Sequence, residues 1–133
     1  MVICDTKVLF PTYEPTTARE ITLTRLSNYI PLFAEQNVVF IKIDVEGSEG
    51  KAIEGGIELI KKYHVPFIFL EFTPMALKFH GTDPKQFLQL FANNDYKFGI
   101  SNFFEKKFYT VEEILKICKF QLNLYIVHSK ILE

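Results

Sequence analysis

The chain has 133 residues, a formal net charge of −1, 48% hydrophobic residues and 23% charged residues. This balance is typical of a soluble globular domain and excludes an intrinsically disordered chain. The near-zero charge gives no general attraction to nucleic acid or to an anionic membrane, so we expect neither as a partner. No apolar run approaches the roughly 20 residues of a membrane-spanning helix, and no signal-peptide pattern is present. We therefore expect a single domain over residues 1–133 and a cytoplasmic location.

The chain begins with a segment that lacks regular periodicity. Residues 1–20 contain two prolines and a threonine pair, so we expect an irregular lead-in with at most a short strand near residues 8–10. Residues 21–25 alternate apolar and polar side chains, which suits a strand or an extended entry. Residues 26–35 could form a short helix, which Pro31 would weaken.

Apolar strand-like runs and helical patterns then alternate along the chain. Strands are expected at residues 38–43, 66–72, 96–100 and 122–127, because these runs are short, mostly apolar and rich in β-branched or aromatic residues. Helices are expected at residues 48–63, from Asp83 to about 93, and from the capping-box residue Thr110 to about 118. Gly55 and Gly56 lie inside the first helix, where close packing on the sheet would explain them. This order predicts an α/β fold with a largely parallel sheet.

Acidic residues stand at the ends of the first two expected strands. Asp44 and Glu46 follow the first strand, and Glu71 lies near the end of the second. The carboxyl ends of parallel strands open on one crevice, and side chains two apart in a strand face the same way. Such carboxylates could bind magnesium, bind hydroxyl groups or take a proton from an attacking hydroxyl. Acids also end strands simply because turns prefer polar residues, so that interpretation stays open. Asn102, after the third strand, is a weaker candidate.

Other residues with reactive side chains form no comparable pattern. The three histidines are scattered and match no metal-ligand spacing, so we expect no metal site built on them. The two cysteines, Cys4 and Cys118, form no disulfide framework, and free thiols are the favoured interpretation.

The residues around Asp44 resemble a known family. The segment Ile-Lys-Ile-Asp-Val-Glu-Gly-Ser-Glu at 41–49 closely resembles the Lys-Ile-Asp-Val-Glu-Gly-x-Glu signature of FkbM-type methyltransferases. Ile-Glu-Gly-Gly at 53–56 resembles the Leu-x-Gly-Ala that follows, and residues 66–71 resemble the next strand, which ends in Glu. Tyr96 resembles the tyrosine of the family's Gly-Tyr pair. The likeness extends from about residue 21 to 127.

The resemblance implies a class I (Rossmann-like) methyltransferase fold, a seven-stranded sheet with helices on both faces. This chain would supply the fourth to seventh strands, the last one antiparallel. The implied activity is transfer of the methyl group of S-adenosylmethionine to a hydroxyl oxygen on a sugar or other small molecule. Magnesium remains possible beside the acids.

The resemblance also assigns roles to individual residues. Asp44 would orient the acceptor or act as the base, and Glu46 and Glu71 would be supporting acids. Glu49 would steady the loop from the helix N-terminus, and we take it as a candidate substrate contact. Asn102 is a second candidate substrate contact, but only because of its position after the third strand and not because of the resemblance.

The sequence departs from the family pattern in three ways. Ser27 stands where the family often has Asp, and Asp95 stands where Gly usually precedes the tyrosine. The glycine-rich loop after the first strand of the full fold, and the acid after the second, have no counterpart. We therefore expect the chain to be the C-terminal portion of a methyltransferase that needs an N-terminal half, and we assign no cofactor contact.

Two alternatives remain. The chain could be a non-catalytic remnant that acts as an interaction module, with self-association through an open sheet edge. It could also be a magnesium-dependent phosphotransferase or hydrolase built on Asp44 and Glu46, although no phosphate-binding glycine loop accompanies them.

Overall fold

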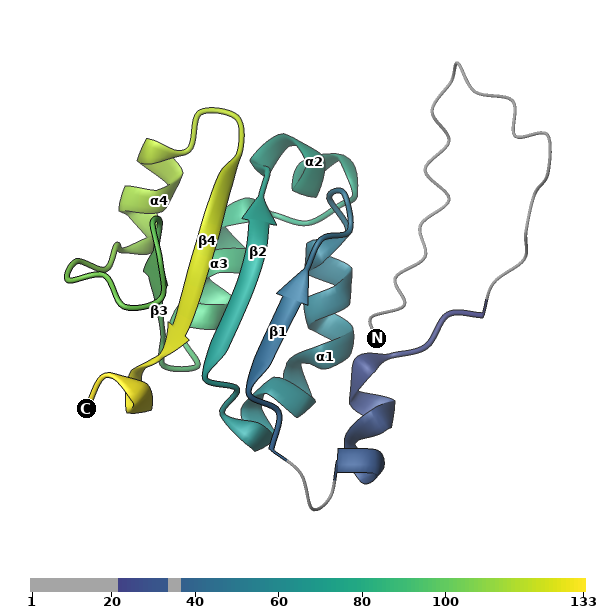
Figure 1. Cartoon of the computed structure of the whole chain (residues 1–133). Helices are drawn as coiled ribbons and strands as arrows, with labels where there is room; N and C mark the ends of the chain where they lie inside the picture. The colour runs from purple at the N-terminus through teal and green to yellow at the C-terminus, as the bar shows by residue number, and fades with distance from the viewer. Residues whose placement is uncertain (1–21, 34–36) are drawn as a thin grey trace.

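Four strands form a single sheet in the computed structural model, which describes residues 22–33 and 37–133. The order across the sheet is β1-β2-β4-β3 (Figure 1). The strands are β1 (Phe40–Ile43), β2 (Phe67–Phe72), β3 (Tyr96–Gly99) and β4 (Leu122–His128). Each lies within or almost within a range predicted from its apolar run.

The direction of the strands confirms a largely parallel sheet with an antiparallel last strand. β1 and β2 are parallel, whereas β4 pairs antiparallel with both β2 and β3. β1, β2 and β3 therefore run the same way, and their carboxyl ends meet at one edge of the sheet (Figure 1). Ligands of open α/β sheets bind at this edge.

The larger helices lie against one face of the sheet, behind it in Figure 1. β1 to β2 and β2 to β3 step across the sheet in the same direction, and right-handed crossovers then place both connecting helices on the same face. The expectation of helices on both faces is therefore wrong for the described part of the chain. The helices are η1 (Leu26–Phe33), α1 (Glu49–Tyr63), α2 (Pro74–Phe79), α3 (Pro84–Ala92), α4 (Val111–Ile117) and η2 (Ser129–Ile131).

The helix starts follow local sequence signals. The hydroxyl of Thr110 accepts the backbone N–H of Glu113 at 3.2 Å, and the Glu113 carboxylate accepts that of Thr110 at 2.9 Å. This reciprocal pair confirms the predicted capping box. The carboxylate of Asp83 likewise accepts the Gln86 N–H at 2.8 Å. α2 was not predicted; its signals are Thr73 before the helix and a proline at its first turn.

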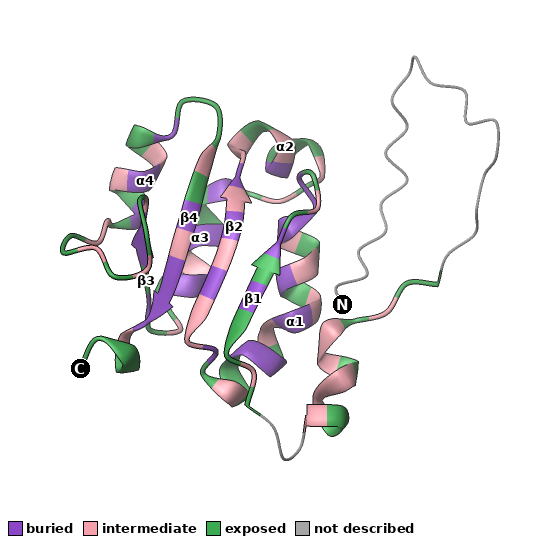
Figure 2. Cartoon of the chain, viewed as in Figure 1, coloured by how far each residue is buried: buried purple, intermediate pink, exposed green. Residues whose placement is uncertain are grey.

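Burial alternates along the strands, because successive side chains point to opposite faces (Figure 2). The helix-covered face carries the core, which includes Ile43, Leu70 and Ile126. The opposite face carries aromatic rings instead. Phe103, in the loop after β3, packs edge-on against rings of this face; its ring centroid lies 6.0 Å from Phe40, 5.1 Å from Phe67 and 5.2 Å from Tyr125.

η1 packs against α1 beside the β1 edge of the sheet. A Cβ on Gly56 would lie 3.0 Å from Cδ2 of Leu26, and a Cβ on Gly55 would lie 3.7 Å from Cα of Arg25. Gly56 therefore allows close packing, whereas a Cβ on Gly55 would make only an ordinary contact; the partner of α1 at this point is η1 rather than the predicted sheet. η1 is a 3-10 helix that contains Pro31, which agrees with the weak helix expected there.

Some predictions concern residues that the structure does not describe. The short strand near residues 8–10 and Cys4 lie outside the described ranges. Cys118 is a buried free thiol whose Sγ lies 3.7 Å from the carbonyl oxygen of Phe72. Neither described stretch contains a helix with the length and apolar character that crossing a bilayer requires.

Candidate functional site

A sharp turn connects β1 to α1 at the carboxyl edge of the sheet. Glu46 and Gly47 both have positive φ, 53° and 97°, and the N–H of Ser48 donates to the carbonyl of Val45 at 3.1 Å. The left-handed backbone suits glycine. A Cβ on Gly47 would also lie 2.8 Å from Cβ of Ala76 in α2. The turn and α2 are therefore in close contact, and residue 47 has room only for glycine.

Glu49 lies beneath this turn and fixes it. Its side chain is buried, with 3% relative exposure, and its carboxylate accepts the backbone N–H of Val45 at 3.2 Å. Burial raises the pKa of the Glu49 carboxyl, and this outweighs the backbone hydrogen bonds that lower the pKa. Glu49 thus holds the loop as expected, but its burial places it under the loop rather than on the open rim.

Three polar residues form a row across neighbouring strands at the carboxyl edge. The β1–β2 register ends with Ile43 opposite Leu70, so Asp44, directly after β1, and Glu71, the next residue of β2, follow side by side at the carboxyl edge. Glu71 in turn lies directly opposite Asn123 of β4. Directly opposed residues have Cβ atoms roughly 4.5–5.5 Å apart. We call Asp44, Glu71 and Asn123 the polar row.

The polar row borders the aromatic part of the open sheet face. Two residues before Glu71 on β2, Phe69 lies opposite Tyr125 of β4, and their ring centroids are 5.1 Å apart. Asp44 is exposed, and its carboxylate forms an ion pair with the Lys42 ammonium at 3.5 Å. A molecule at this edge would therefore meet oxygen acceptors, one cation and aromatic surface together.

The structure separates the other predicted site residues from this row. β1 ends at Ile43, and Glu46 lies in the turn with left-handed backbone, so the strand alternation expected to pair Asp44 with Glu46 does not apply. Glu46 is exposed and close enough to Glu49 to contribute to raising its pKa. Asp44 directly follows β1, and Glu71 lies in the adjacent strand β2, as the crevice interpretation requires.

Asn102 lies in the loop after β3, at the opposite edge of the sheet from β1. Its amide oxygen accepts the N–H of Phe104 at 2.8 Å, and its own N–H donates to Glu105 at 3.1 Å. Glu105 also accepts the N–H groups of Ile100 and Ser101. Asn102 therefore takes part in a loop that Glu105 organises, and this loop follows β3, the strand at the other edge of the sheet from β1.

Sequence reasoning missed Asn123. The only available signal was one polar residue inside an otherwise apolar strand, Leu-Asn-Leu-Tyr-Ile-Val. Its position opposite Glu71 depends on β4 entering the sheet between β2 and β3, which the chain order does not disclose. In residues 22–33 and 37–133, no three His, Cys, Asp or Glu side chains are grouped so that they could hold a metal ion.

The family model of the methyltransferase FkbM domain matches residues 5–98, which is more than half of the chain. The chain belongs to the FkbM methyltransferase family. The match includes Asp44, Glu46, Glu49 and Glu71 and ends in β3, so Asn123 lies beyond it. No curated protein and no solved structure matches the chain.

FkbM family membership identifies the chain as a methyltransferase-type domain, and such enzymes generally use S-adenosylmethionine. The described residues do not form a complete cradle for this cofactor. The turn after β1 contains one glycine with positive φ, and the space beside that glycine is filled by Ala76 and His80 of α2.

Proposed function

We propose that this FkbM-type chain binds the hydroxyl-bearing acceptor of a methyl-transfer reaction at the polar row. The observation that supports the proposal is the strand pairing at the carboxyl edge: Glu71 lies opposite Asn123, and Asp44 follows the last paired residue of β1 just as Glu71 follows that residue's partner, Leu70. Oxygen acceptors spaced by single strands suit a molecule with several hydroxyl groups, such as a sugar, because each hydroxyl can donate one hydrogen bond.

Asp44 has the leading chemical role in this proposal. Its exposed carboxylate can accept a hydrogen bond from the reacting hydroxyl and then take its proton as the oxygen is methylated. Lys42, 3.5 Å away, restrains the direction of the carboxylate. Glu71 and Asn123 would hold neighbouring hydroxyls and so fix which one lies beside Asp44. S-adenosylmethionine would supply the methyl group.

We further propose that the catalytic unit is a class I methyltransferase to which this chain contributes the last four strands. Two features support this: β1 forms an edge of the sheet, and the last strand is inserted antiparallel between β2 and β3. The glycine-rich loop that holds the cofactor would then come from polypeptide N-terminal to this chain. The uncovered aromatic face gives that polypeptide a surface to pack on.

Cofactor binding and methyl transfer test the proposal separately. S-adenosylmethionine is titrated calorimetrically into the 133-residue protein and into the longer gene product, if the gene encodes one. Labelled methyl transfer to a panel of sugars and small alcohols is then measured. We expect Asp44→Asn to lower kcat about 10²- to 10⁴-fold, the range for loss of a general base. The control Glu58→Gln changes an exposed acid on α1. Equal activity of the two variants would remove Asp44 from the mechanism.

The open edge of β1 favours a second candidate, a non-catalytic interaction module. If the protein is such a module, no form of it should transfer methyl groups, and the 133-residue protein should self-associate as its concentration rises. Sedimentation velocity of the 133-residue protein over a hundredfold concentration range distinguishes the two. A single monomeric species together with measurable transfer by the longer product would exclude the module.

A further inference from the structure

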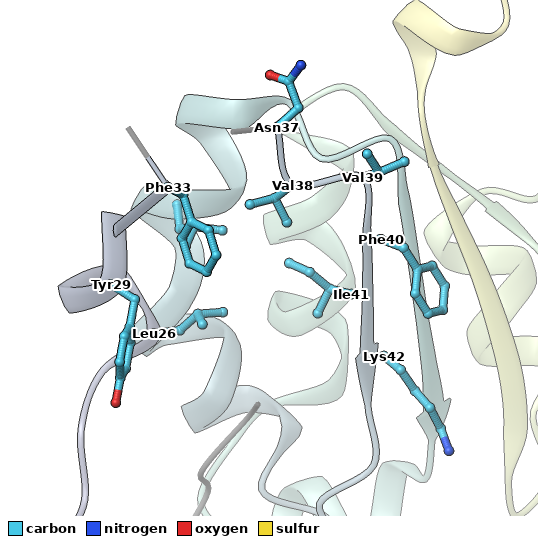
Figure 3. A pocket seen from close by; sticks show the side chains of 10 residues that line it. Leu26, Tyr29, Phe33, Asn37, Val38, Val39, Phe40, Ile41 and Lys42 are labelled. Carbon is cyan, nitrogen blue, oxygen red and sulfur yellow. The ribbon is translucent and has the colours of Figure 1, made fainter. Parts of the chain in front are cut away.

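An apolar groove of about 630 Å³ lies between η1 and β1, at the edge of the sheet that β1 forms (Figure 3). Leu26 and Phe33 line it from η1, and Ile41 lines it from β1. In the class I unit proposed above, strands N-terminal to this chain would pair with β1 and cover this groove. The groove is therefore part of the proposed catalytic unit, and a separate feature lies at the amino ends of the strands.

β4 ends with His128, beside the amino ends of β2 and β3 (Figure 1). His128 is only 3% exposed, and its backbone N–H donates to the Pro66 carbonyl at 3.0 Å. The ring centroids of His64 and Tyr96 lie 5.1 Å and 4.9 Å from that of its imidazole. The Tyr96 hydroxyl donates to the Val65 carbonyl at 2.9 Å. The imidazole is thus held in a buried junction between the end of α1 and the beginning of β3.

The same imidazole caps the short 3-10 helix η2, which begins at Ser129. Its Nδ1 accepts the backbone N–H of Lys130 at 3.3 Å. Nδ1 can accept only while it carries no proton, so neutral His128 has its proton on Nε2. When Nδ1 takes a proton from solvent, the acceptor becomes a donor that faces the Lys130 N–H, and the hydrogen bond is lost.

The surroundings of the ring also disfavour a positive charge on it. Burial lowers the pKa of His128, and the neighbouring His64 imidazole lowers it further. The Asp95 carboxylate raises this pKa, the Lys130 ammonium lowers it, and the Glu133 carboxylate raises it. A ring that leaves the junction for water regains its ordinary pKa of 6.5. The released state therefore binds the proton more tightly, and a fall in pH favours release.

We propose that His128 is a pH-dependent latch: the neutral imidazole holds η2 in place, and its protonation at mildly acidic pH releases the ring and unwinds η2. Three features of the junction support this. The ring is buried, only the unprotonated Nδ1 can make the cap bond, and a second imidazole lies 5.1 Å away. The N–H of Ser129 donates to the Asp95 carbonyl at 2.8 Å, and this bond does not depend on the latch. The movement therefore affects the residues that follow Ser129.

NMR of the full 133-residue protein between about pH 4.5 and pH 8 tests the latch. The titration of the His128 ring is followed together with the ¹⁵N relaxation of the Lys130 and Ile131 amides. The order parameters of these two amides should fall from about 0.85 to below about 0.6, with the same midpoint as the ring. Order that persists after the ring is charged would overturn the proposal. So would a ring that stays neutral until the whole protein unfolds.

Two charge variants and one control show whether the midpoint has the stated cause. His64→Asn removes a neighbouring positive charge and should raise the midpoint, whereas Asp95→Asn removes a negative charge and should lower it. Both residues have left-handed backbone, φ 42° and 65°, which asparagine tolerates. His80→Gln removes a histidine beside the turn at the carboxyl edge and should leave the midpoint unchanged. Shifts in the opposite directions, or an equal shift in the control, would contradict the latch.

His128→Asn keeps a side-chain acceptor before η2 and removes the titration. The order of the Lys130 amide should then no longer depend on pH, and a loss of order that still follows the pH would overturn the proposal. If this variant does not fold, the unmodified protein and the two charge variants still decide the question. None of these readouts involves methyl transfer, so the result is independent of the proposed function.

Discussion

The Glu49 carboxylate accepts the backbone N–H of Val45 at 3.2 Å, and this bond closes the turn that follows Asp44. A buried acid at the first position of α1 thus sets the shape of the loop on the rim of the proposed site. The side chain is removed from the chemistry, but the position of Asp44 depends on it.

Glu49 should make the stability of the protein depend on pH. Because burial raises its pKa in the folded state above 4.5, the folded state binds more protons than the unfolded state at pH values between 4.5 and the raised pKa. The stabilisation is fully present below pH 4.5 and is lost as the pH rises through the folded-state pKa. Glu49→Gln keeps a hydrogen-bond acceptor for Val45 and removes the titration, so its free energy of unfolding should lack this fall.

Urea unfolding followed by circular dichroism between pH 4 and pH 8 checks this prediction. Glu58→Gln is the control, because Glu58 is exposed on the same helix. Glu49→Ala should be less stable than Glu49→Gln by about 1–3 kcal/mol, since the Val45 N–H loses its partner. A Glu49→Gln variant with the pH profile of the unmodified protein would contradict the prediction.

Substitution of Gly47 separates backbone strain from crowding. Gly47→Ala should cost about 1–2 kcal/mol for left-handed backbone, plus the cost of moving α2 away from the new methyl group. Gly81 has φ 82° but nothing within 4 Å of a built Cβ, so Gly81→Ala should cost the strain alone. The difference between the two free energies of unfolding measures the contact with Ala76. Equal values would mean that the turn and α2 do not touch.

The ring of Phe103 should contribute more to stability than that of its neighbour. Phe103 packs against rings of three strands, Phe40, Phe67 and Tyr125, whereas Phe104 is 73% exposed. We expect Phe103→Ala to cost about 2 kcal/mol and Phe104→Ala less than about 1 kcal/mol, given about 0.5–1.5 kcal/mol for each aromatic pair beyond buried area. Thermal unfolding of both variants gives the comparison. A larger loss for Phe104 would show that the loop lies differently over the sheet.

Asn123 should affect acceptor binding rather than the chemical step. Asn123→Ala removes one neutral hydrogen bond, worth about 1 kcal/mol, so KM for the acceptor should rise about fivefold with little change in kcat. Lys97→Ala is the control, since Lys97 is exposed on β3 and lies opposite Val127, away from the polar row. An unchanged KM for Asn123→Ala would show that Asn123 does not bind the acceptor and would leave Asp44 and Glu71 as the binding residues of the polar row.

The strands were predictable because each is a short apolar run with a clear beginning and end. Periodicity and capping residues located α1, α3 and α4 for the same reason, as the Thr110–Glu113 pair illustrates. The six-residue α2 was missed, although its first turn carries a proline, because so short a helix shows no full period.

The composition of the site was predictable only where it depends on neighbours in the sequence. Asp44 and Glu71 follow from strand ends, and their adjacency follows from one parallel crossover. Asn123 depends on a pairing between the second and the last strand, whose paired residues are 50 to 60 positions apart in the sequence, and local patterns carry no information on such a partner. The location of the larger helices on one face of the sheet follows from right-handed crossovers combined with the strand order. Right-handed crossovers could be expected from the sequence, but the strand order could not.

The contact between Gly56 and Leu26 has a consequence for the β1 edge. Leu26 belongs both to this helix–helix contact and to the lining of the groove. The spacing between η1 and β1 therefore depends on Gly56, which lies on the side of α1 that packs against η1 and is not part of the lining itself. A methyl group at position 56 would push Leu26 outward and widen the groove between β1 and η1. A glycine that helix packing requires therefore also determines the width of this groove.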